Sequence, residues 1–200
     1  MISGIILAAG ASVRMGQPKA AMPFGQMGET ILSRIVSTFL IGGATEIVVV
    51  AGAHIDAVRR AMPVHEARAR VIEHTGWQLG QLSSLLAGLA ALDTPHLEAV
   101  MVTPVDVPLV TASTVATVID AWRRSRAPIV RPAAGERHGH PVIFDRSVFA
   151  DLRAADPTVG AKAVFATHRE RVLNVEVSDA GAFEDIDTPE DYERLISSQF

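Results

Sequence analysis

The chain has 200 residues, of which 48% are hydrophobic and 20% charged, and its formal net charge is −4 at pH 7. This composition is typical of a globular protein and excludes a disordered one, and the length predicts a single domain over residues 1–200. The acidic balance argues against a nucleic-acid partner. The chain has no cysteine, which excludes disulfides, thiolate zinc sites and thiol nucleophiles.

Two expectations follow for metals and for cellular location. Any metal site must use oxygen or histidine ligands, which favours a hard cation such as Mg²⁺. The apolar run Ile5–Ala9 is too short to span a bilayer and follows no basic segment. We therefore expect a cytoplasmic protein without a membrane partner.

Apolar runs with strand character alternate with helical periodicity along the chain. In chain order, the patterns predict a strand at Ile5–Ala9, a helix near Thr30–Leu40, a strand at Ile47–Val50, a helix at Ile55–Met62, a strand at Val71–Ile72, a helix at Leu82–Leu92, a strand at Ala99–Val102, a helix at Ala112–Arg124, strands at Pro128–Arg131 and Pro141–Phe144, helices at Arg146–Ala154 and Gly160–Thr167, a strand at Val172–Val177 and a helix at Pro189–Ser197. This order predicts an α/β fold with a mostly parallel sheet covered by helices on both faces. Ligands of such sheets bind beyond the carboxyl ends of the strands, so functional residues are expected to follow strands.

A loop with small residues follows the first predicted strand. The small residues at positions 8–12 let backbone N–H groups approach an anion closely, and Arg14 and Lys19 add positive charge. The spacing of Gly10 and Gly16 matches neither a P-loop nor a dinucleotide-binding fingerprint. These residues alone predict an anion-binding loop. The alternative is a glycine-containing surface turn with two incidental basic residues.

The segment Leu7–Lys19 resembles the signature of the MobA-like nucleotidyltransferases, Leu-Ala-Ala-Gly-x-(Ser/Gly)-x-Arg-Met-Gly-x-x-Lys, at every defined position. The resemblance covers the chain from Ile5 to Ile196. It implies a Rossmann-like three-layer α/β sandwich of the nucleotide-diphospho-sugar transferase type, with a mostly parallel mixed sheet. It also implies that Arg14 and Lys19 contact phosphates and take part in catalysis. The loop residues that it assigns to nucleotide binding are Leu7, Ala8, Ala9, Gly10, Ser12, Arg14 and Lys19.

Asp106 follows the fourth predicted strand, in the sequence Asp-Val-Pro-Leu. Its local pattern suits a tight turn before Pro108, which is a structural alternative to a functional role. The same family has an Asp-x-Pro-Leu motif here, and the resemblance implies that Asp106 binds Mg²⁺ and is catalytic. One or two carboxylates are what Mg²⁺ takes beside substrate phosphates.

A second acidic cluster precedes the last predicted helix. Thr188 is expected to cap that helix and Pro189 to be its first residue. Asp185 and Asp187 lie before the cap, which leaves both carboxylates without a structural role. The family carries Asp-Ile-Asp-Thr-Pro-Glu-Asp here, and the resemblance implies that Asp187, rather than Asp185, completes the metal site.

Three further segments resemble the molybdenum cofactor cytidylyltransferase branch of the family. The segment Trp77–Leu85 implies that Gly80 and Ser84 bind the nucleotide, with a polar N-cap of the following helix as the structural alternative. The strand Gly139–Phe144 implies that His140 and Pro141 bind the acceptor. The third segment, Asp156–Lys162, departs from the branch pattern, with Lys162 in place of an arginine.

The resemblance implies transfer of a nucleotide from an NTP, with CTP favoured, to a molybdopterin-type acceptor, releasing pyrophosphate. A molybdoenzyme or its maturation factor is the expected recipient of the product. Three alternatives of the same kind are a GTP-dependent guanylyltransferase, a sugar-phosphate nucleotidyltransferase and an enzyme with a phospholactate-type acceptor. Two alternatives come from other classes: a non-catalytic protein that binds or delivers the cofactor, and a nicotinamide oxidoreductase. The missing glycine fingerprint argues against the oxidoreductase.

Overall fold

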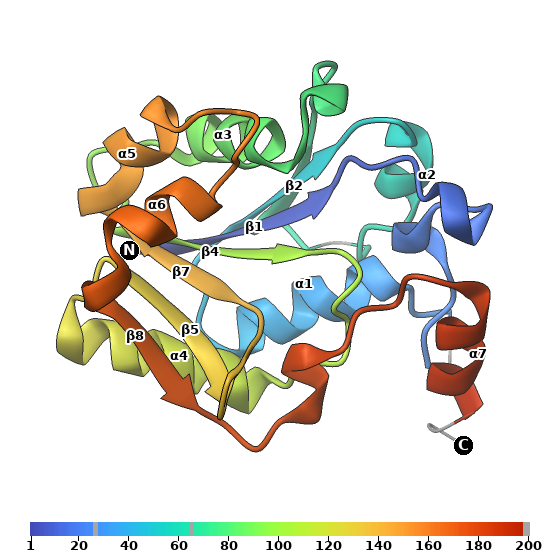
Figure 1. Cartoon of the computed structure of the whole chain (residues 1–200). Coiled ribbons are helices and arrows are strands. Elements are labelled where there is room, and N and C mark those ends of the chain that lie inside the picture. The colour runs from blue at the N-terminus through green and yellow to red at the C-terminus, as the bar shows by residue number, and fades with distance from the viewer. Residues whose placement is uncertain (26–27, 65, 198–200) are drawn as a thin grey trace.

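The computed structural model describes residues 1–25, 28–64 and 66–197. Within them an eight-stranded sheet has the order β3-β2-β1-β4-β7-β5-β6, and β8 pairs with β5 on its other edge (Figure 1). Strands β7 and β6 run against the others, so the sheet is mixed but mostly parallel, as expected. The strands are β1 (Ile2–Ala8), β2 (Ile47–Ala51), β3 (Ala69–Glu73), β4 (Ala99–Pro104), β5 (Ile129–Ala134), β6 (Arg137–His138), β7 (Val142–Asp145) and β8 (Val172–Glu176).

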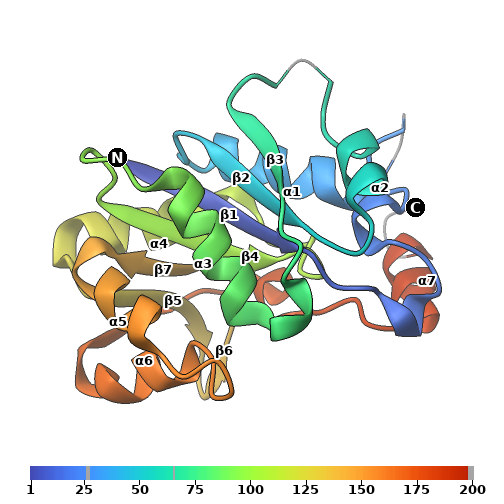
Figure 2. The same cartoon turned by 90° about the horizontal axis from the view of Figure 1, so that it is seen from above.

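Helices cover both faces of this sheet and make it the middle of three layers. From above, α3, α5 and α6 lie on the near face of the sheet (Figure 2). The seven α-helices of the described residues are α1 (Ile31–Ile41), α2 (Ile55–Arg60), α3 (Gln81–Leu92), α4 (Ala112–Ser125), α5 (Phe149–Ala154), α6 (Lys162–Thr167) and α7 (Pro189–Ser197). None of the helices in these ranges is long and apolar enough to cross a membrane.

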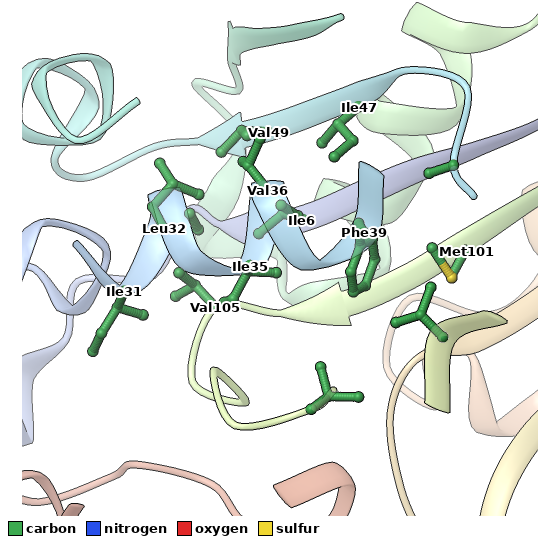
Figure 3. Packing of buried hydrophobic residues seen from close by; sticks show 14 of the residues in the cluster. Ile6, Ile31, Leu32, Ile35, Val36, Phe39, Ile47, Val49, Met101 and Val105 are labelled. Atoms are coloured by element: carbon green, nitrogen blue, oxygen red, sulfur yellow. The ribbon is translucent and has the colours of Figure 1, made fainter. Parts of the chain in front are cut away.

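The core lies in two clusters, one on each face of the sheet, because side chains alternate along a strand. Ile6 belongs to the cluster under α1 and α4, whereas its neighbour Ile5 belongs to the cluster under α3, α5 and α6. Figure 3 shows the first cluster, in which α1 packs Leu32 and Val36 against the sheet. On the other face, a Cβ at Gly88 of α3 would lie 2.7 Å from Ile5, so glycine lets this helix approach the sheet closely.

Parallel pairing aligns the ends of three central strands. Leu7 of β1 is opposite Val50 of β2 on one side and Pro104 of β4 on the other. The loops that follow these strands therefore leave the sheet side by side at the carboxyl ends of the strands, which we call the binding edge. This edge is where the expected ligand-binding residues must lie.

Among the differences between the structure and the sequence-based elements, three concern how strands pair. The strand predicted at Pro141–Phe144 is present as β7, but it runs antiparallel between β4 and β5. The short hairpin strand β6 was not predicted. The third strand, expected at Val71–Ile72, is longer because β3 pairs in parallel with the whole of β2. Pairing partners decide all three features, and local periodicity carries no information about them.

A C-terminal arm, residues 177–197, returns from β8 to the edge at which β1 ends. Its α7 lies beside the segment that follows β1 (Figure 1), where the Tyr192 hydroxyl donates to the Pro23 carbonyl at 2.7 Å. As expected, Pro189 begins α7 and Thr188 Oγ1 caps it by accepting from the Asp191 N–H at 3.2 Å. The Asp191 carboxylate accepts from the Thr188 N–H at 3.0 Å, which completes a reciprocal cap.

Asp179 fastens the beginning of this arm to the N-terminus of α4. One carboxylate oxygen accepts from the Thr114 hydroxyl at 2.6 Å and from both the N–H and the hydroxyl of Thr111 at 2.9 Å. The other accepts from the Gly181 N–H at 3.1 Å. Desolvation raises the pKa of Asp179, but these hydrogen bonds outweigh it, so the pKa lies below its usual value.

We expect Asp179→Ala to lower the free energy of unfolding by about 2 kcal/mol, because it leaves several donors without an acceptor. Urea denaturation measures this change, with Asp120→Ala on the exposed face of α4 as a control expected within about 0.5 kcal/mol of wild type. The folded-state pKa is depressed, so the stabilisation is complete above the unfolded pKa of about 3.9 and is lost as pH falls through the folded value. The difference between wild type and variant must therefore shrink in acid, and a constant difference would contradict the assignment.

Candidate active site

A cleft of about 480 Å³ opens at the carboxyl ends of β1 and β4. Its floor is formed by the end of β1 and the loop that follows, and its sides come from the segments after β2, before α3 and after β4. The predicted nucleotide and metal residues all line it. These are Leu7, Ala8, Ala9, Gly10, Ser12, Arg14, Lys19, Gly80, Ser84, Asp106 and Asp187.

The loop after β1 folds into two short 3₁₀ turns, Val13–Met15 and Lys19–Ala21. Ser12 has a left-handed backbone conformation, with φ 49° and ψ 38°. Such a conformation is costly for a residue other than glycine and persists where the surroundings enforce it. Left-handed residues beside right-handed ones turn successive N–H groups towards one concave side, which suits an anion.

Two cations of this loop meet two carboxylates in a single cluster. The ammonium of Lys19 lies 2.8 Å from Asp187 Oδ1 and 3.2 Å from Asp106 Oδ2. The guanidinium of Arg14 lies 3.0 Å from the other oxygen of Asp187. Lys19 is buried, with 8% of its surface exposed, whereas Arg14 reaches solvent. Segments 87 and 168 residues apart in sequence from Lys19 thus converge on one ammonium group.

The charges of this cluster shift the acidities of its carboxyl groups. The hydrogen bond from Lys19 lowers the pKa of Asp187, and the positive charges of Lys19 and Arg14 outweigh desolvation. The pKa of Asp185 shifts in the opposite direction. Desolvation raises it, and the negative charges of Asp106 and Asp187 add to the shift. Asp187 is the carboxylate that contacts both cations of the loop, whereas Asp185 makes no ion pair with them among the described residues.

The donor set fits a hard divalent cation. Asp106 and Asp187 already share one cation, since the ammonium of Lys19 is within hydrogen-bonding distance of both. No group of three or more histidine, aspartate or glutamate side chains gathers into a metal cage among the described residues. Two carboxylates with the remaining positions left to water and phosphate oxygens are characteristic of Mg²⁺ and similar cations bound with a substrate.

His54, which follows β2, supports the loop and was not anticipated from the sequence. Its Nε2 lies 3.0 Å from the Ala11 carbonyl oxygen, and the neighbouring Ala53 N–H donates to the Ala9 carbonyl at 3.1 Å. Both contacts give loop carbonyls a partner from the segment after β2, and His54 also lines the cleft. The signal that could have found it is its position three residues beyond the end of a strand at the binding edge.

The segment before α3 forms one wall of the cleft. Gly80 has φ 98° and ψ 178°, a conformation that L side chains rarely adopt. It occupies the N-cap position of α3, and no side chain caps that helix end, so the polar N-cap considered for this segment is absent. Ser83 instead donates to the Gly80 carbonyl at 2.7 Å and contacts His74 Nε2 at 3.0 Å. The segment is thus fixed by Ser83, while Ser84 is buried and lines the cleft.

A second cavity of about 340 Å³ adjoins the first and shares Leu7, Gln81 and Pro104 with it. His140 lines it together with apolar side chains of β7 and the segment Pro157–Lys162. Burial lowers the pKa of His140, and its Nδ1 is buried without a hydrogen-bond partner. Pro141, expected beside it at the acceptor site, is buried and is absent from the described lining of both cavities.

The sequence can be compared with known proteins once this geometry is established. Residues 4–172 match the protein-family model of the MobA-like NTP transferase domain. This chain belongs to the MobA-like NTP transferase family. The match ends at the start of β8, so Asp187 lies outside it, although the structure brings this residue to Lys19.

Relatives of this MobA-like chain carry different names. It is 34% identical over 206 residues to "Nicotine blue oxidoreductase" of Paenarthrobacter nicotinovorans, covering 98% of this chain and 96% of that one. It is 29% identical over 137 residues to "Probable molybdenum cofactor guanylyltransferase" of Mycolicibacterium paratuberculosis, covering 68% and 66% of the two chains.

A solved structure shares the complete MobA-like fold. The crystal structure of Rv0371c from Mycobacterium tuberculosis superposes with a TM-score of 0.81 at 27% identity and covers 98% of both chains. The same protein has also been solved as a complex with manganese, with a TM-score of 0.73 and 27% identity, again over 98% of both chains. A divalent cation has thus been observed with a relative of this chain.

The His54 contact predicts a measurable effect on anion binding. We expect His54→Phe to weaken binding of inorganic triphosphate about tenfold, because it leaves the Ala11 carbonyl without its donor in the loop. Isothermal titration calorimetry measures the affinity. His54→Gln retains an N–H donor and should restore most of the loss. Equal losses in both variants would show that the hydrogen bond is not the cause.

Proposed function

We propose that this MobA-like protein transfers the nucleotidyl group of an NTP, with CTP favoured, to the phosphate of a molybdopterin-type acceptor and releases pyrophosphate. The observation that carries the proposal is the cluster in which Lys19 and Arg14 meet Asp106 and Asp187 at the end of β1. It combines phosphate-binding cations with a pair of carboxylates suited to a divalent cation.

The loop after β1 is proposed to bind and orient the triphosphate. The residues from Leu7 to Gly10, with Ser12, cradle it through backbone N–H groups, while Arg14 and Lys19 balance its charge. The acceptor phosphate then attacks the α-phosphorus in line, a P–O bond to it forms, and the bond to the departing pyrophosphate breaks. No protein nucleophile is needed, so catalysis rests on positioning and electrostatic stabilisation.

Asp106 and Asp187 are proposed to hold Mg²⁺, with Asp187 preferred over Asp185 because it faces Lys19 directly. When bound, the cation neutralises phosphate charge as a Lewis acid. These two carboxylates would hold the cation beside the loop that carries Arg14 and Lys19. The proposed catalytic groups of the protein itself are Arg14, Lys19 and Asp106.

The two adjoining cavities suggest where the two substrates bind. Gly80 and Ser84 belong to the cleft with the phosphate-binding loop, which we assign to the nucleotide. His140 lines the second cavity, which we assign to the acceptor, whereas its neighbour Pro141 is buried outside the described lining. Burial lowers the pKa of His140, which favours an uncharged imidazole as the hydrogen-bonding group for the acceptor.

Within the same reaction class, GTP in place of CTP and a sugar phosphate in place of molybdopterin remain the alternatives. The relative named as a guanylyltransferase supports the first of these. A protein that binds and delivers the finished cofactor without catalysis is the alternative from another class. We expect the product to pass in the cytoplasm to a molybdoenzyme or its maturation factor.

The experiment that tests the proposal is pyrophosphate release with purified protein, Mg²⁺, molybdopterin and each of the four NTPs. We expect turnover with CTP, and Asp106→Asn should lower kcat/KM by about 10²–10³-fold, the scale of losing one charge-stabilising group. Asp56→Asn, an exposed carboxylate on α2, is the matched control and should match wild type.

Two results would contradict the proposal. Absence of turnover with any NTP and molybdopterin would refute the assigned reaction. Unchanged turnover in a folded Asp106→Asn variant would refute the metal site. Folding is checked by thermal melting, in which an NTP at 100 times its Kd should stabilise the protein by about 2.7 kcal/mol.

A second candidate function rests on the relative that is named an oxidoreductase and aligns along nearly the whole chain. In this case a reduced nicotinamide cofactor would donate a hydride to an aromatic acceptor in the second cavity. The missing glycine fingerprint argues against such a cofactor site. We therefore expect no acceptor-dependent loss of NADH or NADPH absorbance, with nicotine blue as the test acceptor. Oxidation that competes with CTP would favour this second function instead.

A further inference from the structure

The two cations assigned to phosphate binding are already paired within the protein. Lys19 contacts Asp106 and Asp187, and Arg14 contacts the second oxygen of Asp187. The formal charges of these four groups sum to zero. An incoming triphosphate therefore meets a neutral cluster in which two carboxylates already compete for the charges that it needs.

We propose that these ion pairs close the site to free triphosphate and that a divalent cation opens it by exchange. In this exchange the carboxylates of Asp106 and Asp187 replace the cations of the loop with the divalent cation. Arg14 and Lys19 replace the carboxylates with phosphate oxygens. The number of ion pairs is then conserved. The ligand of the site is thus the metal–triphosphate chelate as one unit, an inference that rests on the proposed function.

The surrounding backbone holds the carboxylates in place during such an exchange. The Ile186 N–H donates to the Asp106 carbonyl at 2.8 Å, so the two acidic segments are joined through their main chains. The Asp187 N–H donates to the Asp191 carboxylate at 3.2 Å, which ties it to the cap of α7. The side chains that must change partners are those of Lys19, which is buried, and Arg14, which is exposed.

A free triphosphate gains less binding free energy at this site than the metal–triphosphate chelate does. If it takes Lys19 and Arg14, it leaves Asp106 and Asp187 without their cations beside its own negative oxygens. Like charges at such short range disfavour each other strongly where water is limited, and Lys19 is buried. The pair between Arg14 and Asp187 is exposed and individually weak, so this part of the exchange is readily reversible.

The contacts predict a ranking of variants. Asp187 pairs with both cations, Asp106 pairs with Lys19 alone, and Asp185 makes no ion pair among the described residues. Removing the charge of Asp187 frees Arg14 and releases Lys19 from one of its two partners, while removing that of Asp106 only releases Lys19 from one partner. Asp185→Asn removes the same charge from the same segment without freeing either, which makes it the matched control.

The test measures binding of inorganic triphosphate, a probe without a base, by calorimetry in EDTA and in Mg²⁺. In EDTA we expect Asp187→Asn to bind about tenfold more tightly than wild type, within the range of about 5–150-fold seen for coupled sites. Asp106→Asn should show a smaller gain, and Asp185→Asn should stay within about twofold of wild type. In Mg²⁺ the order must reverse, with wild type tighter than Asp187→Asn.

Several outcomes would overturn the inference. Asp187→Asn binding no more tightly than wild type in EDTA would show that the ion pairs do not restrain the loop. An equal gain in Asp185→Asn would show a general effect of net charge. Thermal melting confirms that each variant is folded. Failure of wild type to bind triphosphate even with Mg²⁺ would instead refute the proposed function.

Binding of Mn²⁺ provides an independent readout that needs neither turnover nor a base. Paramagnetic resonance of free Mn²⁺ measures binding of the cation to the protein alone, where Lys19 competes with it for the carboxylates of Asp106 and Asp187. Lys19→Met should bind Mn²⁺ alone more tightly than wild type does. Unchanged Mn²⁺ affinity in that variant would contradict the exchange.

Discussion

One ammonium group, Nζ of Lys19, joins three parts of the chain that the sheet brings to the same edge. It lies within 3.2 Å of a carboxylate that follows β4 and a carboxylate of the C-terminal arm. The helices and strands matter to the site because they hold these three segments in register. The parallel pairing of β1 with β2 and β4 aligns the ends of these strands. The C-terminal arm returns to the same place, and Asp179 fastens the beginning of the arm to α4.

Much of the fold could be predicted from the sequence, because long periodic segments indicate their own secondary structure. The amphipathic patterns of α1 and α4 and the β-branched run of β2 could be interpreted from local spacing alone. The reversed direction of β7 could not, because its neighbours β4 and β5 are set by pairing across the sheet. The hairpin strand β6 has only two residues, too few for any pattern.

The candidate site was predictable in part, and for a different reason. The residues from Leu7 to Lys19 indicate an anion-binding loop by their own chemistry, whereas Asp106 and Asp187 were associated with it through the family resemblance. Distances of 87 and 168 residues along the chain leave no local trace of such contacts. His54 was missed because a single histidine carries little signal, and Pro141, expected at the acceptor site, is buried outside the described lining of the second cavity.

The sequence separation between Lys19 and Asp187 also has a consequence in time. At synthesis rates of about 5–20 residues per second, Lys19 is made roughly 10–30 s before the carboxylate that pairs with it most closely. The early βαβ units can assemble during that interval, because their strands are close in sequence. A nascent chain then displays a cationic loop at the sheet edge before the arm arrives. Until the arm docks, Arg14 has no carboxylate partner in the cluster and Lys19 has only that of Asp106.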